Sequence, residues 1–390
     1  MLHRRFGRTE INLPVFSCGG MRFQQSWSAD KPVTDDNQKN LEKVLAHAFE
    51  LGINHVETAR GYGTSEAQLG RALKAYPRDS FVLQSKVSPV ADPKRFEANL
   101  EESFKRLQVE RLDLFAFHGV NNQNDFDWMV RPGGCYEVAD RFRKEGRISH
   151  LGFSTHAARD LIVKTINTNL FDYVNLHWYY IFQENLPAIE AAAKLDMGVF
   201  IISPNDKGGH LHTPRPQWIG DCAPLTPMQF NELFCLSNPN VHTLTLGASR
   251  PSDYDAHVAA LAHLKNATLD PHKVLALVAP TVHKLNARWT AAMGEDFGKT
   301  YLQGVPDWDS MPGGVNVRKA LWLWGLVKAW DLLGYARSRY NMLSQNDTWF
   351  PGNKVAQFDA TALRAALCNS PHVERILSIL PQAHEILNEA

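Results

Sequence analysis

Cysteine is scarce and scattered in this sequence. Five cysteines occur among 390 residues, and no two of them form a CxxC pair. Structural zinc sites and iron–sulfur clusters use several thiolate or imidazole ligands at short spacing, and disulfide frameworks use an even number of cysteines. We therefore expect no metal site, no iron–sulfur cluster and no disulfide framework. We interpret most of the thiols as small buried side chains in a reducing compartment.

Net charge is absent as well, because 41 Lys and Arg residues balance 41 Asp and Glu residues. Proteins that bind nucleic acid by neutralising phosphates, and polybasic proteins of membrane surfaces, need an excess of positive charge. No apolar stretch approaches the ~18 residues that span a bilayer, and no hydrophobic run follows the first residues as in a secretory signal. We expect a cytoplasmic protein with no nucleic-acid partner and no membrane span.

The glycine fingerprint GxGxxG of doubly wound dinucleotide-binding sheets is also missing, since Gly61-Tyr62-Gly63 is followed by Glu66 where the third glycine would stand. Short apolar runs instead alternate with amphipathic segments, a pattern typical of repeated βαβ units. Eight such units in ~250 residues favour a (β/α)₈ TIM barrel. The expected strands span 14–19, 53–59, 81–87, 112–120, 149–155, 173–178, 198–203 and 242–248.

Two further segments complete the expected organisation. Residues 2–16 alternate around Gly7-Arg8-Thr9 and predict an N-terminal hairpin that plugs the bottom of the barrel. From about residue 271 the pattern changes to helices and turns, with a Trp-rich apolar helix expected over 315–335. We therefore expect a barrel over 1–268 and a C-terminal α-helical domain over 269–390.

Four polar side chains fall on or just after three consecutive strands. Glu57 ends one strand and Tyr62 follows it in the loop, Lys86 lies near the end of the next strand, and His118 ends the third. The C-terminal ends of the strands form the active-site face of a (β/α)₈ barrel. Each residue alone has an ordinary structural explanation, but their joint placement predicts a site.

These residue types suit the reduction of a carbonyl group. A free Tyr, with a pKa near ~10, is a weak acid at neutral pH. A nearby ammonium favours the phenolate, and a carboxylate keeps that ammonium charged and oriented. A neutral imidazole can donate a hydrogen bond to a carbonyl oxygen. Together they can protonate a carbonyl oxygen while hydride arrives at carbon.

With these residues the chain resembles the aldo-keto reductase family of nicotinamide-dependent (β/α)₈ barrels, over about 1–264. The motifs that carry the resemblance are Gly19-Gly20-Met21, the block from Glu57 to Glu66, Lys86, His118, Lys144-Glu145-Gly146-Arg147-Ile148, Leu151-Gly152-Phe153-Ser154 and Ile201-Ile202-Ser203-Pro204. The resemblance implies that Tyr62 is the general acid/base, that Lys86 and Glu57 tune it, and that His118 orients the substrate carbonyl.

The resemblance also implies a cofactor site. Ser154, Thr155 and Asn175 fall where the family holds the nicotinamide carboxamide, and 203–208 falls where it cradles the pyrophosphate. The full set of implied cofactor contacts is Gly20, Met21, Arg22, Ser154, Thr155, Asn175, Ser203, Pro204, Asn205, Lys207, Gly208, Gly247, Ser249 and Arg250.

The chain departs from the family pattern at several of these positions. Glu57 replaces the usual Asp, Asn175 stands where Gln is common, and Ile202 stands where an aromatic side chain often stacks on the nicotinamide. In the last loop Arg250 remains as the obvious phosphate partner, which favours NADPH, whereas Asp253 leaves NADH possible.

The C-terminal region resembles the helical appendage of a subgroup of these reductases that carries ferredoxin-like cysteine motifs. Met311-Pro312-Gly313-Gly314-Val315 and Arg339-Tyr340-Asn341-Met342 carry this likeness, but Cys368 is the only cysteine there, so no cluster is expected. The appendage would cover the barrel or bind a protein partner.

The expected function is NAD(P)H-dependent interconversion of a small-molecule carbonyl and an alcohol. The alternative is a regulatory or scaffold subunit that retains only cofactor binding.

Overall fold

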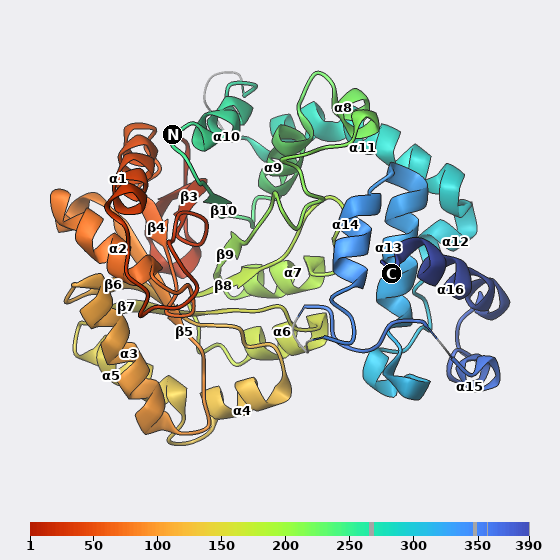
Figure 1. Ribbon diagram of the computed structural model, residues 1–390, viewed down its shortest axis with the longest axis horizontal. Coiled ribbons are helices and arrows are strands. Elements are labelled where there is room, and N and C mark those ends of the chain that lie inside the picture. Colours follow the sequence, from red (N-terminus) through yellow and green to blue (C-terminus); the bar gives the residue numbers. More distant parts are fainter. Residues whose placement is uncertain (265–268, 346–348, 357, 390) are drawn as a thin grey trace. The chain divides into compact units, whose positions relative to one another are not determined.

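Eight parallel strands close into a barrel in the computed structural model, which describes residues 1–264, 269–345, 349–356 and 358–389. The strands follow one another around the barrel in chain order, and the last pairs with the first (Figure 1). They are β3 (Phe16–Gly19), β4 (His55–Glu57), β5 (Val82–Val87), β6 (Leu112–Phe117), β7 (Ile148–Ser154), β8 (Tyr173–Leu176), β9 (Gly198–Ile201) and β10 (Thr243–Gly247). The expected (β/α)₈ barrel is thereby confirmed.

Helices connect the strands and pack on their outer side, with α3, α5 and α7 against β5, β7 and β9. They are α1 (Asp35–Glu50), α2 (Ser65–Ala72), α3 (Pro93–Leu107), α4 (Gln123–Val130), α5 (Cys135–Lys144), α6 (Arg159–Asn167), α7 (Leu186–Lys194), α9 (Pro227–Ser237) and α10 (Asp253–Leu261). Helix α4 was not predicted from the sequence. Its signal is a capping box, in which Asn122 and Asp125 satisfy each other's backbone N–H groups.

The N-terminal hairpin lies at the N-terminal ends of the barrel strands, as predicted. Strands β1 (His3–Arg5) and β2 (Asn12–Pro14) pair antiparallel, and the 3₁₀ turn η1 (Gly7–Thr9) joins them. Gly7 has a φ of +53°, and a Cβ there would lie 2.4 Å from the backbone nitrogen of Gly198 at the start of β9. Phe6 and Leu13 are fully buried in a cluster with Tyr173 and Phe200 of the barrel. The hairpin therefore closes this end of the barrel with packed side chains.

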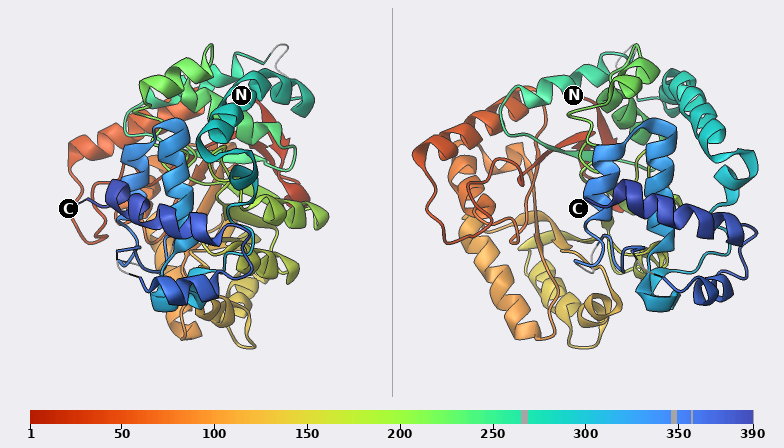
Figure 2. Two further views of the ribbon diagram at one scale, coloured as in Figure 1. Left: turned by 90° about the vertical axis from the view of Figure 1, so that its right-hand side faces the viewer. Right: turned by 45° about the vertical axis from the view of Figure 1, so that its right-hand side comes forward.

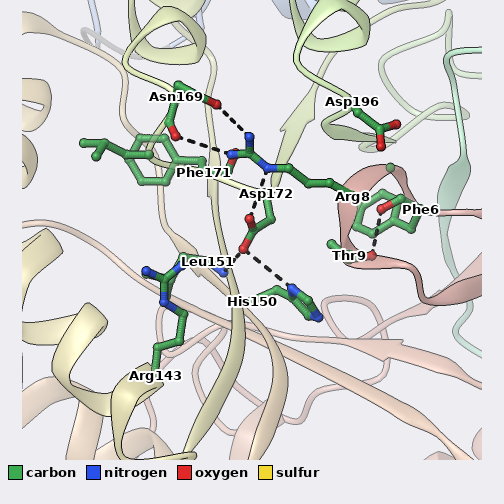
Figure 3. A network of polar contacts seen from close by, with 12 residues as sticks. Phe6, Arg8, Thr9, Arg143, His150, Leu151, Asn169, Phe171, Asp172 and Asp196 are labelled. Atoms are coloured by element: carbon green, nitrogen blue, oxygen red, sulfur yellow. Dashed lines mark hydrogen bonds and ion pairs between the residues drawn. The ribbon is translucent and has the colours of Figure 1, made fainter.

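A polar network fastens the same hairpin to the start of β8 (Figure 3). Arg8 donates from Nε to Asp172 Oδ1 at 3.2 Å, from a terminal nitrogen to Asn169 Oδ1 at 2.6 Å, and to the carbonyl oxygen of Phe171. The other oxygen of Asp172 accepts from the backbone N–H of Leu151 at 3.1 Å and lies 3.6 Å from His150 Nδ1. One guanidinium thus bonds three residues just ahead of β8.

The described residues form two compact units, 1–208 with 228–276, and 209–227 with 277–390. Residues 209–227 belong to the second unit, although they lie before the single boundary expected at residue 268. That division itself falls on residues 265–268, which lie outside the described part of the chain. Among the described helices none is both long and apolar enough to cross a membrane.

The second unit is helical, with α13 (Val317–Trp330) packed against α14 (Leu333–Tyr340) and α16 (Val373–Leu387), drawn in blue in Figure 2. Its other elements are α8 (Pro216–Cys222), most of α11 (Pro271–Met293), α12 (Glu295–Thr300), η5 (Trp308–Ser310), η6 (Pro312–Gly314) and α15 (Ala360–Ala366). The single helix expected over 315–335 is instead two helices, because Asp331 adopts a left-handed conformation with φ 53°.

The tryptophans of α13 are interior residues. Trp322, Trp324 and Trp330 are 4%, 7% and 6% exposed. The ring of Trp330 lies 5.1 Å from Trp289 and 6.2 Å from Trp218 between centroids, and its Nε1 donates to the carbonyl oxygen of Leu285 at 3.0 Å. The apolar face of α13 therefore contributes to the core of its own unit.

We predict that Asp172→Asn weakens the barrel in a pH-dependent way. Burial raises the pKa of Asp172, but His150, the Leu151 N–H and Arg8 together outweigh burial and hold the pKa below its usual value. The ionised Asp172 carboxylate therefore stabilises the fold fully above the pKa of ~3.9 that it has in the unfolded chain. This stabilisation is lost as the pH falls through the pKa of Asp172 in the folded protein. The variant should lose about 1–3 kcal/mol of unfolding free energy at neutral pH.

Urea titration across pH measures this difference, which should narrow as the pH falls below ~4. Asp160→Asn is the matched control, because Asp160 pairs with Arg159 but its side chain is 82% exposed. The control should change stability by less than ~1 kcal/mol. A pH-independent loss in Asp172→Asn would contradict the ionic role of this carboxylate.

Candidate active site

The four side chains singled out from the sequence lie together at the C-terminal ends of β4, β5 and β6. Glu57 is the last residue of β4, Lys86 lies in β5 opposite Ala116 of β6, and His118 directly follows β6. Tyr62 lies in the loop between β4 and α2. Parallel pairing of adjacent strands places these residues at one end of the barrel.

Lys86 and Glu57 form a buried ion pair. The ammonium contacts Glu57 Oε2, and the two side chains are only 1% and 4% exposed. Lys86 Nζ also donates to the carbonyl oxygen of Thr58 at 2.8 Å, and Glu57 Oε1 accepts from Thr245 Oγ1 of β10 at 2.8 Å. The Glu side chain, where the family has Asp, thus reaches Lys86 on the adjacent β5 and Thr245 on β10, which is separated from β4 by β3. Thr245 was not predicted as a site residue.

The ring of Tyr62 lies over this pair and beside His118. Lys86 Nζ is 4.9 Å from the centroid of the Tyr62 ring, and the His118 ring is 5.5 Å away at an interplanar angle of 86°. Tyr62 and His118 are both partly exposed, whereas Lys86 and Glu57 are buried beneath them. A substrate therefore has access to the phenol and the imidazole but not to the ion pair.

The protonation states at neutral pH follow from burial and from the ion pair. Burial lowers the pKa of Lys86, but the charge of Glu57 and the Tyr62 phenol outweigh burial and raise it overall. Burial raises the pKa of Tyr62 more than Lys86 lowers it. Burial and the nearby Lys86 charge lower the pKa of His118 to about 3. The site therefore presents a neutral phenol and a neutral imidazole above a charged ammonium.

The residues expected at a nicotinamide site lie at the ends of β7 and β8. Asn175 is fully buried, and neither its Nδ2 nor its Oδ1 has a hydrogen-bond partner in the described residues. A buried amide with both groups unsatisfied fits a ligand that offers one donor and one acceptor, as a carboxamide does. The hydroxyls nearby already have partners: Ser154 Oγ accepts from the Gly119 N–H at 3.0 Å, and Thr155 Oγ1 donates to the Val120 carbonyl at 2.7 Å.

The loop after β3 passes close to the same rim. A Cβ on Gly20 would lie 2.8 Å from Ser65 Oγ and 3.0 Å from the carbonyl oxygen of Glu57. Met21 and Arg22 follow Gly20 directly. Arg22 continues toward the loop after β9, where a terminal nitrogen lies 3.8 Å from Asp206 Oδ1, and its Cγ would lie 2.7 Å from a Cβ on Gly247. Because Gly20 has no side chain, the loop can pass close to Ser65 and Glu57. Because Gly247 has none, Arg22 can lie against the backbone of β10.

The loop after β9 holds Ser203, Pro204, Asn205, Lys207 and Gly208. Lys207 Nζ lies 3.3 Å from His177 Nε2 and 3.5 Å from His156 Nδ1. The two imidazoles stack with centroids 4.6 Å apart. Burial, Lys207 and His118 lower the pKa of His156 well below its usual value. The Lys207 ammonium therefore lies beside a His156 imidazole that is neutral at neutral pH. Neither His156 nor His177 was predicted as a site residue.

Two buried residues of α9 and α10 hold the start of this loop. His257 of α10 is 1% exposed, and its Nδ1 bonds Glu232 Oε1 of α9. Its Nε2 lies 3.5 Å from Asn205 Nδ2, while Asn231 Nδ2 donates to the carbonyl oxygen of Pro204 at 2.9 Å. The sequence signal for this chain of contacts is weak, because the partners come from three separate elements.

In the loop after β10, Asp253 organises Ser249 and Arg250. One oxygen of Asp253 accepts from the backbone N–H groups of both residues, at 2.9 and 3.2 Å, and the other accepts from Arg250 Nε at 2.8 Å. The side chain of Arg250 is 76% exposed. The structure therefore places the carboxylate at Nε and leaves the terminal guanidinium nitrogens toward solvent. In the part of the chain that the structure describes, no group of His, Cys, Asp and Glu could hold a metal ion.

Comparison with known proteins agrees with this architecture. The model of the aldo/keto reductase family matches residues 16–208. An uncharacterized oxidoreductase of Bacillus subtilis is 23% identical over 231 residues, which cover 52% of this chain and 66% of the relative. L-Galactose dehydrogenase of Arabidopsis thaliana is 21% identical over 297 residues, or 68% of this chain and 90% of that protein.

Among solved structures, an aldo-keto reductase of Bacillus halodurans in its holo form has a TM-score of 0.60 and 18% identity. The match covers 72% of this chain and 96% of that one. At this identity the likeness shows the fold.

The buried ion pair generates a stability prediction. Glu57→Gln or Lys86→Met leaves one buried charge without its counter-charge, which should cost about 3–5 kcal/mol of unfolding free energy in each variant. The double variant removes both charges and should be far more stable than the sum of the single losses implies. Urea denaturation of the four proteins measures the coupling. Thr245→Val, which removes only a neutral hydroxyl donor, should cost about 1 kcal/mol. If the stability loss of the double variant equalled the sum of the two single losses, Lys86 and Glu57 would not interact directly.

Proposed function

The barrel of this chain belongs to the aldo-keto reductase family, and we propose on that basis that the protein reduces an aldehyde or ketone to an alcohol, or catalyses the reverse oxidation, with NADPH as its cofactor. One observation carries the proposal: a neutral phenol and a neutral imidazole lie at the exposed side of a buried Lys86–Glu57 pair.

Tyr62 acts as the general acid in this proposal. Its hydroxyl donates a proton to the carbonyl oxygen of the substrate, and the Lys86 ammonium stabilises the phenolate that results. Glu57 keeps Lys86 charged and in place beneath the ring. The raised pKa of Tyr62 keeps the proton on the phenol at neutral pH until the substrate oxygen gains negative charge.

His118 orients the substrate. Since the pKa of its imidazole is lowered to about 3, it is neutral, carries one N–H, and does not compete with Tyr62 as a source of protons. It can donate a hydrogen bond to the same carbonyl oxygen and stabilise the charge that develops there. When bound, a reduced nicotinamide supplies hydride to the carbonyl carbon.

Asn175 supports the cofactor assignment. Its two unsatisfied amide groups would bond the carboxamide of the nicotinamide, with Ser154 and Thr155 beside it. The loop from Ser203 to Gly208 and the glycines of the β3 and β10 loops would bind the pyrophosphate. These are the residues that would position the cofactor against Tyr62.

Arg250 favours NADPH over NADH. Asp253 bonds the guanidinium at Nε, and the two terminal nitrogens of this largely exposed side chain would make a bidentate contact with a 2′-phosphate. Asp253 is thereby occupied by Arg250 and by two backbone N–H groups, which makes it a poor partner for ribose hydroxyls.

We predict that Tyr62→Phe lowers kcat by about 10²–10⁴-fold, because the missing hydroxyl acts in the transition state. Cofactor affinity, measured by the quenching of protein fluorescence, should stay close to that of the wild type. Tyr76→Phe, which removes the hydroxyl of a ring that packs on Phe49 in the helical layer, is the matched control and should keep full turnover. Near-normal turnover in Tyr62→Phe would exclude Tyr62 as the acid.

We predict that Arg250→Ala weakens NADPH binding by roughly 10- to 150-fold and leaves NADH binding nearly unchanged. Arg250→Lys should give an intermediate loss, because an ammonium keeps the charge but cannot bind a phosphate bidentately. Titration of both cofactors against the three proteins measures this. Equal weakening of NADPH and NADH, or a wild-type preference for NADH, would show that Arg250 does not recognise the 2′-phosphate.

A further inference from the structure

Three imidazoles follow three neighbouring strands at the rim of the barrel. His118 comes directly after β6, His156 comes two residues after β7, and His177 directly follows β8. The pairing of β6 with β7 and of β7 with β8 places them in this order around the rim. The proposed reaction uses His118 but neither of the other two. The contacts of His156 and His177 therefore need an explanation of their own.

His156 begins a chain of hydrogen bonds that ends on the backbone. Its Nδ1 bonds Nε2 of His177, whose Nδ1 lies 2.6 Å from the hydroxyl of Tyr179. The Tyr179 hydroxyl in turn donates to the carbonyl oxygen of Ile202, the residue directly after β9. His177 and Tyr179 are both buried, so water does not interrupt this chain.

The backbone end of the chain determines where each proton lies. A carbonyl oxygen only accepts, and the Tyr179 hydroxyl has a single proton, which it donates to Ile202. His177 must therefore donate to Tyr179 from Nδ1. The Lys207 ammonium, which only donates, lies 3.3 Å from Nε2 of His177, so this nitrogen is an acceptor. Nδ1 of His156 must then carry the proton of the bond between the two imidazoles.

His156 is left with a lone pair on Nε2. Burial, Lys207 and His118 lower the pKa of its imidazole well below the usual value, so at neutral pH the ring holds one proton, the one on Nδ1. Within the described part of the chain no donor bonds Nε2 of His156, and the side chain is partly exposed. Because the charge of His118 affects this pKa, the lone pair belongs to a ring close to the candidate site.

The backbone of His156 is held as well as its ring. Its N–H donates to Asn121 Oδ1, in the loop after β6, at 2.7 Å. An acceptor that is fixed in advance costs less conformational entropy to use for binding than a mobile one. A ligand hydroxyl can donate to it, whereas a carbonyl or carboxylate oxygen offers only further lone pairs.

We propose that Nε2 of His156 accepts a hydrogen bond from a hydroxyl group of the bound ligand. The hydroxyl belongs either to a substrate that carries one on the carbon next to its carbonyl, or to a ribose of the cofactor, and both offer the same donor. The inference rests on the proposed function, because that function brings both molecules to this rim. His177 and Tyr179 are positioning residues, since they keep the proton of His156 on Nδ1.

Kinetics with lactaldehyde and propanal, which differ only by the hydroxyl next to the carbonyl, test the substrate as its source. His156→Asn keeps a polar group near the position of Nδ1 but has none at Nε2, whereas His156→Gln places an acceptor there. His156→Asn should lower kcat/KM for lactaldehyde by roughly 2- to 12-fold more than for propanal, and His156→Gln should recover most of this difference.

Titration of NADPH against the same proteins tests the ribose as the source. In that case His156→Asn should bind NADPH roughly 2- to 12-fold more weakly and leave the ratio of the two aldehydes unchanged. His283→Asn, which replaces an exposed imidazole of α11, is the control and should alter neither quantity. If His156→Asn changed neither the aldehyde ratio nor the affinity for NADPH, the proposal would be overturned.

Two measurements that need no turnover separate this inference from the proposed function. Nitrogen-15 NMR of histidine-labelled wild-type protein should show Nε2 of His156 without a proton, and a proton there would refute the acceptor. Direct titration of both aldehydes in the presence of NADP⁺ measures their binding. Selective weakening of lactaldehyde binding in His156→Asn would support the acceptor even if the wild type reduced neither aldehyde, in which case only the proposed reaction fails.

Discussion

The candidate site depends on how the charge of one buried lysine is satisfied. Lys86 is 1% exposed, and a buried ammonium without partners would lose its proton or destabilise the barrel. Glu57 from β4 supplies the counter-charge, the Thr58 carbonyl accepts a second bond, and Thr245 from β10 donates to the carboxylate. The same ammonium lies under the Tyr62 ring and adds to burial in lowering the pKa of His118. One ion pair thereby connects the stability of the barrel with the chemistry available at its rim.

The two ends of the barrel have different roles, since one is closed by packing and the other carries the candidate site. At the N-terminal ends of the strands, the hairpin, Gly7 and Arg8 close the barrel by packing and by a network centred on Asp172. At the C-terminal ends the polar groups are not all satisfied. Among the described residues, the buried amide of Asn175 has no hydrogen-bond partner, and Asn205 Oδ1 has none either. Unsatisfied buried groups reduce stability, and a ligand that supplied the missing partners of Asn175 would offset that cost.

The loops at the rim are positioned by residues behind them. Glu232 and His257, both buried, contact Asn205, and Asn231 holds Pro204. Asp253 holds Ser249 and Arg250, and Thr64 holds the backbone of Gln25 and Ser26. These supporting residues come from α9, α10 and the β4–α2 loop. The geometry of the site therefore depends in part on α9 and α10, which lie far from Tyr62 in sequence.

The sequence by itself determined the eight-stranded barrel, the N-terminal hairpin and the placement of Glu57, Tyr62, Lys86 and His118 at one rim. Periodicity and turn residues are local signals, and parallel pairing brings neighbouring strand ends together whatever the side chains are. Only the tertiary structure decided that Thr245 bonds Glu57, that His257 pairs with Glu232, and that α13 ends at Asp331. It also decided that the imidazoles of His156 and His177 bond each other. These contacts join residues far apart in the chain, and no local pattern encodes the distance between them.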